Sequence, residues 1–148
     1  MSVVAKIKEE LAAFQAKREA LVAQLRTEFP TLIAPILAES KRIESIGWLQ
    51  YTPYFNDGDE CTFGVHNDDL YINGENEYEL DWLNEKVWTG GKYEKNPDVD
   101  QEELIVLKNI KEVLGSIPDD FYKDLFGDHS MVTINKNGTI EVSDYDHD

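Results

Sequence analysis

The residue types that could do chemistry gather in two short stretches of this 148-residue sequence. The first, QYTPYFNDGDECTF (residues 50–63), holds the single cysteine, Cys61, among aromatic, acidic and turn-forming residues. The second, DYDHD (residues 144–148), has three aspartates and one histidine. A cysteine can act as a nucleophile, and carboxylates with an imidazole can hold a divalent cation. Both stretches are therefore candidate sites.

Neither stretch has the pattern of a catalytic or metal site. Cys61 has no activating partner that the sequence identifies, and its predicted neighbours are apolar, as for an inert thiol. NDGDE, residues 56–60, lacks the ligand order of a calcium loop, and the DYDHD carboxylates lie at an end that frays. No P-loop, G-x-S-x-G, G-x-G-x-x-G or H-E-x-x-H motif occurs. We expect no catalytic residue, no bound metal and no cofactor, and the sequence favours a non-enzymatic function.

The acidic residues are unevenly distributed along the chain, whose net charge is −16. Residues 1–45 hold seven basic and six acidic residues, whereas residues 46–148 hold seven basic and 24 acidic residues. No Lys or Arg occurs between Arg42 and Lys86. The negative electrostatic field of this acidic segment repels nucleic acid and anionic membranes and attracts basic protein surfaces. An acidic surface also keeps a small domain soluble, which is the plainer interpretation.

The bulk composition predicts a soluble cytoplasmic protein. No apolar run approaches the roughly 18 residues that a membrane-spanning helix needs. The N-terminal MSVVAKIKEELAAF lacks the unbroken apolar segment of a secretory signal. One cysteine excludes an internal disulfide and a Cys-based zinc site.

An apolar seam runs along residues 2–29, with spacings that alternate between three and four as in a coiled coil. Arg18 interrupts it where an apolar residue is due. We expect Pro30 to end this helix and residues 31–40 to form a second one, giving a helical hairpin or a coiled coil. Two alternatives remain, a helix packed on its own domain, which Arg18 favours, and a homodimer. The predicted oligomerisation residues are Val4, Ile7, Leu11, Phe14, Leu21 and Leu25.

The aromatic segment that follows is predicted to form antiparallel strands. A three-residue loop at 56–58, with its glycine at positive φ, would close the first hairpin. Tyr51 would then pair with Phe63, and Leu49 with Val65. This register gathers the apolar residues on one face, whereas a slip of one residue would mix the two faces.

The other face of this hairpin would carry Trp48, Tyr54 and His66. We expect a helix to cover them, and the alternative is that they bind a partner or stack a planar ligand. The residues that follow are strongly acidic. The full set of predicted binding residues is Trp48, Tyr54, His66, Asp68, Asp69, Glu75, Glu77 and Glu79.

Two helices and a second hairpin are predicted in the C-terminal half. Residues 73–88 suggest a short helix or an irregular segment, and the Gly- and Pro-containing residues 89–100 a loop. Residues 98–117 form a helix with acids in its first turn, and residues 117–128 a further helix. The hairpin predictions pair Ile134 with Ile140 and Val132 with Val142, and the buried stripe of the first helix is Leu104, Leu107, Ile110 and Leu114.

Two segments resemble a group of small, acidic, uncharacterised bacterial and phage proteins. They are IGWLQYTPYFNDGDECTF, residues 46–63, and LFGDHSMVTINKNGTIEVSDYDHD, residues 125–148. The resemblance implies a bacterial or phage origin, and it implies no activity and no catalytic residue.

Together these patterns predict an α+β fold of antiparallel β-hairpins packed with helices, preceded by an N-terminal helical hairpin or coiled coil. Residues 1–45 would be the helical segment and residues 46–148 an acidic α+β domain. The predicted function is that of a non-enzymatic acidic interaction protein. It would be a phage or bacterial modulator that binds a basic, nucleic-acid-binding surface of a partner protein. The alternative is a small-molecule or nucleotide-binding protein that uses the aromatic sheet face.

Overall fold

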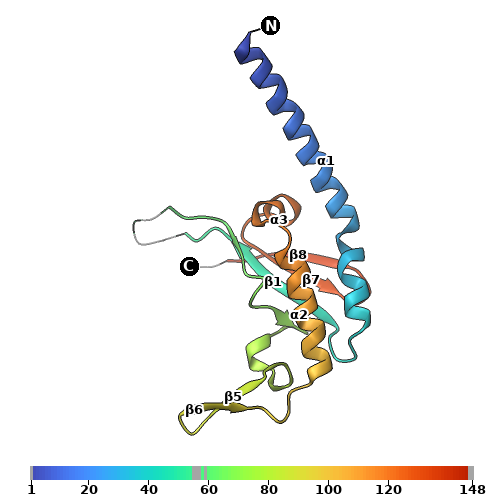
Figure 1. Cartoon of the computed structure of the whole chain (residues 1–148), viewed down its shortest axis with the longest axis vertical. Helices are drawn as coiled ribbons and strands as arrows, with labels where there is room; N and C mark the ends of the chain where they lie inside the picture. Colours follow the sequence, from blue (N-terminus) through green and yellow to red (C-terminus); the bar gives the residue numbers. More distant parts are fainter. Residues whose placement is uncertain (1, 55–57, 59, 147–148) are drawn as a thin grey trace.

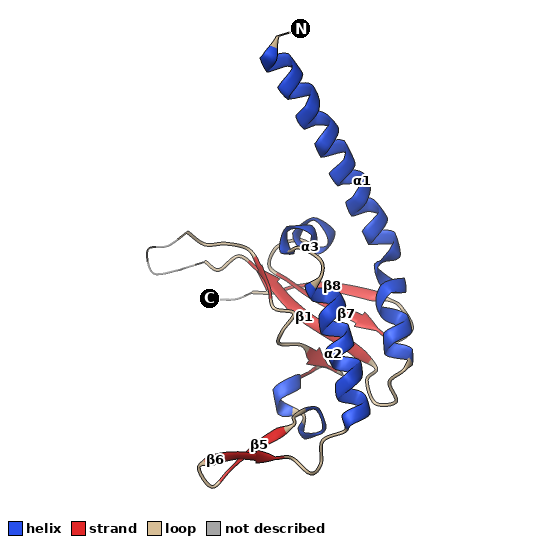
Figure 2. Ribbon diagram, viewed as in Figure 1, coloured by secondary structure: helices blue, strands red, loops and turns tan. Residues whose placement is uncertain are grey.

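Three helices and antiparallel sheets make up the chain in the computed structural model, which describes residues 2–54, 58 and 60–146 (Figures 1 and 2). The helices are α1 (Val3–Ala38), α2 (Gln101–Gly115) and α3 (Asp119–Phe126). This architecture confirms the predicted α+β class. Within the described residues, no helix combines the length and the apolar character needed to cross a membrane.

The main sheet has the strand order β4-β3-β1-β7-β8, and β2 also pairs with β1. Every pairing in it is antiparallel. A separate hairpin consists of β5 (Lys86–Thr89) and β6 (Lys92–Lys95). The strands of the main sheet are β1 (Ser45–Tyr51), β2 (Gly64–Val65), β3 (Tyr71–Ile72), β4 (Glu75–Asn76), β7 (Ser130–Asn135) and β8 (Ile140–Asp144), and two 3₁₀ turns, η1 (Glu77–Glu79) and η2 (Asp81–Leu83), follow β4.

Helix α1 continues through both Pro30 and Pro35, so the prediction that it ends at Pro30 was wrong. A proline inside a helix removes one backbone hydrogen bond and costs about 3 kcal/mol relative to alanine. Buried side chains four residues apart cross both prolines and hold this part of the helix against the sheet: Phe29, Ile33 and Leu37. We infer that their packing outweighs the local preference to break, so residues 31–40 do not form a separate hairpin partner.

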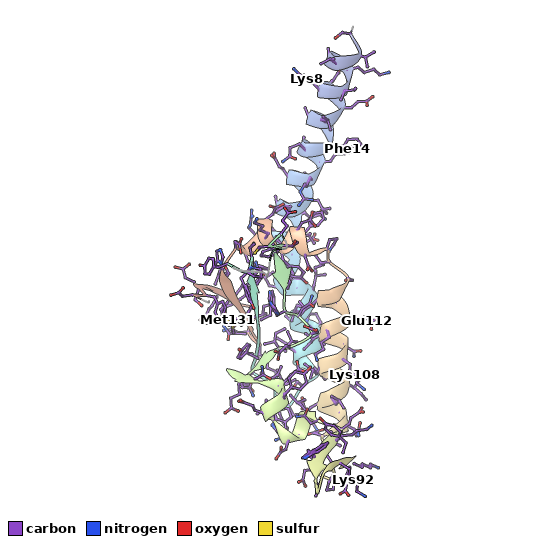
Figure 3. All side chains as sticks on the ribbon, turned by 90° about the vertical axis from the view of Figure 1, so that its left-hand side faces the viewer. Lys8, Phe14, Lys92, Lys108, Glu112 and Met131 are labelled. Carbon is purple, nitrogen blue, oxygen red and sulfur yellow. The ribbon has the colours of Figure 1, made fainter. Side chains whose placement is uncertain are left out.

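The core lies between the three helices and one face of the main sheet (Figure 3). Ile46 and Trp48 of β1 are fully buried on this face, beside Val132 and Ile134 of β7. The indole of Trp48 packs against an aromatic group from two helices: Phe29 of α1, and Tyr122 and Phe126 of α3. The expectation that a helix covers Trp48 is therefore confirmed, and Trp48 is a core residue that no external ligand can reach.

Gln50 is a fully buried polar residue within this aromatic core. Its carbonyl oxygen accepts a hydrogen bond from Trp48 Nε1 at 3.0 Å. Its amide nitrogen donates to the backbone oxygens of Tyr122 at 2.9 Å and Gly127 at 2.7 Å. One side chain thus joins β1 to the middle and the C-terminal end of α3 and gives a hydrogen-bond partner to three other polar groups.

The predicted register of the first hairpin was wrong by one residue. The structure pairs Gln50 with Val65, and Tyr51 with Gly64. The prediction grouped Gln50 with Trp48 on the face opposite to Leu49 and Tyr51, and in the structure the face of Trp48 and Gln50 is the one that lies in the core. Val65, which pairs with Gln50, shares that side.

Most other predicted elements are confirmed. The C-terminal hairpin has the expected pairs Ile134–Ile140 and Val132–Val142, and the predicted stripe of α2 is buried. The loop predicted at residues 89–100 was wrong in part, because Lys92–Lys95 is strand β6.

Glu103 at the start of α2 fixes the connection between α1 and β1. Its buried carboxylate accepts hydrogen bonds from Ser40 Oγ and from the backbone nitrogens of Lys41, at 2.8 Å, and Arg42, at 3.2 Å. These bonds give partners to the hydroxyl and backbone N–H groups of the loop that connects α1 to β1. The C-terminal half of α1 is thereby fixed to the core, and its N-terminal half extends away from it (Figure 1).

Candidate interaction surfaces

The N-terminal half of α1 projects from the body (Figure 1), and most side chains of the predicted seam are exposed. Phe14 is 69% exposed. Figure 3 shows Phe14 and Lys8 on the part of the helix that extends beyond the body. Leu25 differs, because it lies partly buried against the core. The exposed members of the predicted oligomerisation set are Val4, Ile7, Leu11, Phe14 and Leu21.

Arg18 marks the point at which α1 leaves the body. Its guanidinium forms ion pairs with Asp124 at 2.8 Å and Asp120 at 3.1 Å, and lies 4.5 Å from the centroid of the Phe121 ring. The hydrogen bond with Asp124 and the two nearby carboxylates raise the pKa of Arg18. The residue that interrupts the seam is thus an anchor to α3, which the sequence pattern alone did not reveal.

Two hollows flank Phe14 on the projecting helix. One, of about 440 Å³, is bounded by Leu11, Gln15, Lys17, Arg18 and Leu21 together with Phe121 of α3. The other lies on the opposite flank of Phe14, between Glu10, Ala13 and Lys17. Residues at i, i+3, i+4 and i+7 form the hole that receives a side chain in a coiled coil, and residues 11, 14, 15 and 18 have this spacing.

Aromatic and histidine side chains stack where the opening QYTPY stretch leaves the sheet. The rings of Tyr51 and His66 stack with their centroids 4.7 Å apart, and the centroid of the Tyr145 ring lies 5.5 Å from that of Tyr51. Tyr54, which is 59% exposed, stacks on His129 at 4.9 Å. The register places His66 on the sheet face away from the helices, so its predicted position beside Trp48 was wrong.

Asp128 holds this region to β1. Its carboxylate accepts hydrogen bonds from Thr52 Oγ1 at 2.6 Å, from Thr52 N at 2.8 Å and from His129 N at 2.8 Å. Burial by itself raises the pKa of Asp128, but the hydrogen bonds from Thr52 and His129 outweigh burial and lower that pKa. The ionised form is therefore the one that the fold prefers.

Replacement of Asp128 by asparagine is expected to lower the free energy of unfolding by about 1 kcal/mol at neutral pH, because the site is partly exposed to water. A lowered folded pKa gives stability that is present above the unfolded value, about 3.9, and is lost as pH falls through the folded pKa. The difference between wild type and Asp128→Asn in urea unfolding should therefore shrink below pH 4. A difference that stays constant with pH would contradict this assignment.

The predicted acidic residues lie along the β3–β4 edge of the sheet. Asp68, Glu75 and Glu79 are exposed, and none of them forms an ion pair within the part of the chain that is described. Asp69 is half-buried and accepts a hydrogen bond from Asn76 Nδ2 at 2.7 Å. We call Asp68, Asp69, Glu75 and Glu79 the acidic edge.

Glu77 does not belong to the acidic edge, because its side chain is buried. Its carboxylate forms an ion pair with Lys111 of α2 and accepts a hydrogen bond from Leu70 N at 2.7 Å. These contacts attach η1 to the core, so the predicted binding role of Glu77 is replaced by a structural one. Tyr78 beside it is 64% exposed.

The β5–β6 hairpin exposes a second aromatic surface that the sequence interpretation missed. The rings of Trp88 and Tyr93 are exposed and meet edge-on at 4.9 Å, at the end of the molecule opposite to the tip of α1. Gly90 and Gly91 both have positive φ, as a type I′ turn requires. The signal was the Gly-Gly pair between the alternating segments KVWT and KYEK.

The two stretches that were candidate chemical sites are only partly described. No group of three or more His, Cys, Asp or Glu side chains among the described residues could hold a metal ion. Cys61 is a free, half-exposed thiol. Residues 56, 57 and 59 of NDGDE and residues 147–148 of DYDHD lie outside the described residues.

The geometry thus singles out three surfaces: the exposed seam of α1, the acidic edge, and the β5–β6 hairpin. The resemblance to small acidic bacterial and phage proteins stays a prediction. In the comparisons with known proteins, no family model, no curated protein and no solved structure matches this chain.

Proposed function

We propose that this chain is a non-enzymatic interaction protein whose acidic edge binds a basic surface on a partner protein. The observation that carries the proposal is the set of exposed carboxylates of Asp68, Glu75 and Glu79, which have no ion-pair partner among the described residues. Tyr78 adds an exposed aromatic ring to the same edge. Aromatic residues are enriched at protein interfaces, and opposite charges speed association and fix its orientation.

The most suitable partner is a protein whose basic surface binds nucleic acid. Such a surface presents Lys and Arg side chains to phosphate groups, and carboxylates can take the place of those phosphates. The acidic edge lies in the segment between Arg42 and Lys86, which has no basic residue of its own, and Lys111 of α2, which reaches this region, forms its ion pair with the buried Glu77. A phage or bacterial modulator that blocks such a surface fits this chemistry.

The alternative, a small-molecule or nucleotide-binding protein, has less support. Trp48 is buried, and Tyr51 and His66 already stack on one another. A planar ligand would have to displace that stack, in a strongly acidic field that repels phosphates.

A matched pair of triple variants tests the proposed function against a labelled Lys/Arg-rich peptide. Neutralisation of the acidic edge by Asp68→Asn, Glu75→Gln and Glu79→Gln should weaken binding by about tenfold or more, since three direct charge contacts are lost. The control, Glu141→Gln, Asp144→Asn and Asp146→Asn, makes the same change in net charge in and just after the opposite edge strand, β8. It should weaken binding by less than about threefold, through the long-range field alone.

The salt dependence of the same titration completes the test. Binding should weaken steeply as ionic strength rises, because exposed charges are screened. Equal losses in the two triple variants, or an affinity that does not change with salt, would contradict the proposal.

A further inference from the structure

We propose that two copies of this protein associate through an antiparallel pairing of the N-terminal halves of α1. The observation is the projecting helix whose apolar seam is exposed up to the point where Arg18 attaches it to α3. This surface is distinct from the acidic edge, so the pairing stands or falls independently of the proposed function. The register, the charges and the shape of the seam identify a second copy of the chain as the partner.

An antiparallel register that places Leu11 opposite Phe14 of the second copy makes the seam complementary to itself. The same register places Val4 opposite Leu21, at the base of the other projecting helix. The overlap of residues 4–21 would be about 26 Å long. In this arrangement Leu11 of one copy enters the hole between residues 11, 14, 15 and 18 of the other, as knobs-into-holes packing requires.

The interruption at Arg18 fits this register. Arg18 would face Ile7 of the second copy, and the ring of Phe121 beneath the guanidinium extends the apolar surface there. The two Arg18 side chains would then lie about 16 Å apart along the helix pair, from 11 residues at 1.5 Å each. A parallel pairing would instead place the two guanidinium groups in the same layer.

The charges beside the seam favour the same orientation. Glu10 and Lys17 lie on one flank of Phe14, around the second hollow. In the antiparallel register, Glu10 of each copy faces Lys17 of the other, which gives two ion pairs. In a parallel coiled coil Glu10 would face Gln15, so no such pair would form.

The acidic bodies provide a further reason for antiparallel pairing. Residues 46–148 carry 24 acidic and seven basic residues, and a parallel dimer would hold two such bodies at the same end of the helices. The antiparallel pair places them at opposite ends, separated by more than the roughly 8 Å over which charges act in physiological salt. The projecting segment itself is nearly neutral, so it does not oppose the contact.

Sedimentation velocity of the full chain over a range of concentrations is the primary experiment. The wild-type protein should sediment as a monomer–dimer equilibrium. Phe14→Asp should weaken dimerisation by about 100-fold or more, because a carboxylate would be buried at the centre of the seam. Ala16→Asp, on the outer face of the same helix, is the control and should change the dimer dissociation constant by less than about threefold.

Charge reversal tests the register. Glu10→Lys or Lys17→Glu alone should weaken the dimer by about tenfold, since each creates two like-charge contacts, and the double variant should restore it. Glu9→Lys makes the same charge change on the outer face and should have little effect. A wild-type chain that stays monomeric at millimolar concentration would overturn the proposal, and so would single reversals without effect.

Cross-linking tests the orientation, in chains whose native cysteine is removed by Cys61→Ser. A mixture of Val4→Cys and Leu21→Cys chains should form a mixed disulfide dimer, because these positions face each other in the antiparallel register. Val4→Cys chains that cross-link rapidly with themselves, with no mixed product, would show parallel pairing and overturn the inference.

Discussion

Replacement of Gln50 by leucine is expected to lower the free energy of unfolding by about 3–5 kcal/mol. The substitution removes a hydrogen-bond partner from three groups: the buried Trp48 Nε1 and Tyr122 O, and the partly buried Gly127 O. Leucine has a similar volume and is more apolar, so packing alone would predict a neutral or stabilising change. The hydrogen bonds decide the sign, since each buried unsatisfied group costs about 1–3 kcal/mol.

Urea unfolding, followed by far-UV circular dichroism, measures this effect. The matched control is Gln15→Leu, the same substitution on the exposed half of α1, which should change the free energy of unfolding by less than about 0.5 kcal/mol. Gln50→Glu adds a pH signature, because a buried carboxyl beside two carbonyl oxygens has a raised pKa. Its folded state is then favoured below the unfolded value of about 4.3 and loses stability as pH rises above it. A Gln50→Leu protein as stable as wild type would contradict the assigned role of these hydrogen bonds.

The elements that could be predicted from the sequence are those whose signal is local. Helix α2 has an apolar stripe, an acidic first turn and the capping residue Asp100, and all three act within a few residues. The C-terminal hairpin was predicted to the correct register because Ile134 and Val132 meet apolar partners across a glycine turn. Neither prediction depends on contacts with residues far away in the sequence.

The elements that were mispredicted depend on contacts between distant residues. Pro30 is a strong local breaker, yet Phe29 and Ile33 on either side are buried against β1 and α3. Gln50 lies on the core face because its partners come from residues 122 and 127. A pattern of apolar and polar residues cannot show either contact.

For the candidate surfaces too, part of each could be predicted from local sequence and part depends on contacts between distant residues. The α1 seam was predicted from periodicity, and the structure adds that it is exposed and that Arg18 binds α3 at its base. Acidic residues along one segment were evident from the sequence, but only the structure separates the buried Glu77 from the exposed Glu75 and Glu79. Charge counts locate a surface roughly, whereas ion pairs decide which charges remain available.

Phe29→Ala is expected to lower the free energy of unfolding by about 3–5 kcal/mol, because it opens a cavity at the centre of the aromatic core. Phe29 is buried and packs against three aromatic rings. Its ring centroid lies 6.2 Å from that of Trp48, 6.1 Å from that of Tyr122 and 5.3 Å from that of Phe126. Thermal and urea unfolding at low protein concentration, where the chain is monomeric, measure the effect without a contribution from self-association.

Phe14→Ala is the matched control, the same substitution in the same helix. Phe14 lies on the projecting half, so its removal should change the unfolding of the monomer by less than about 0.5 kcal/mol. At higher concentration, where dimers form, Phe14→Ala should have the larger effect, because it should weaken dimerisation. Phe29→Ala should leave the dimer dissociation constant of the folded protein unchanged. The two halves of α1 would then have separate roles, since the residues from Val22 onward stabilise the body and those up to Leu21 form a contact between copies. A Phe14→Ala protein destabilised as a monomer to the same extent as Phe29→Ala would contradict this division.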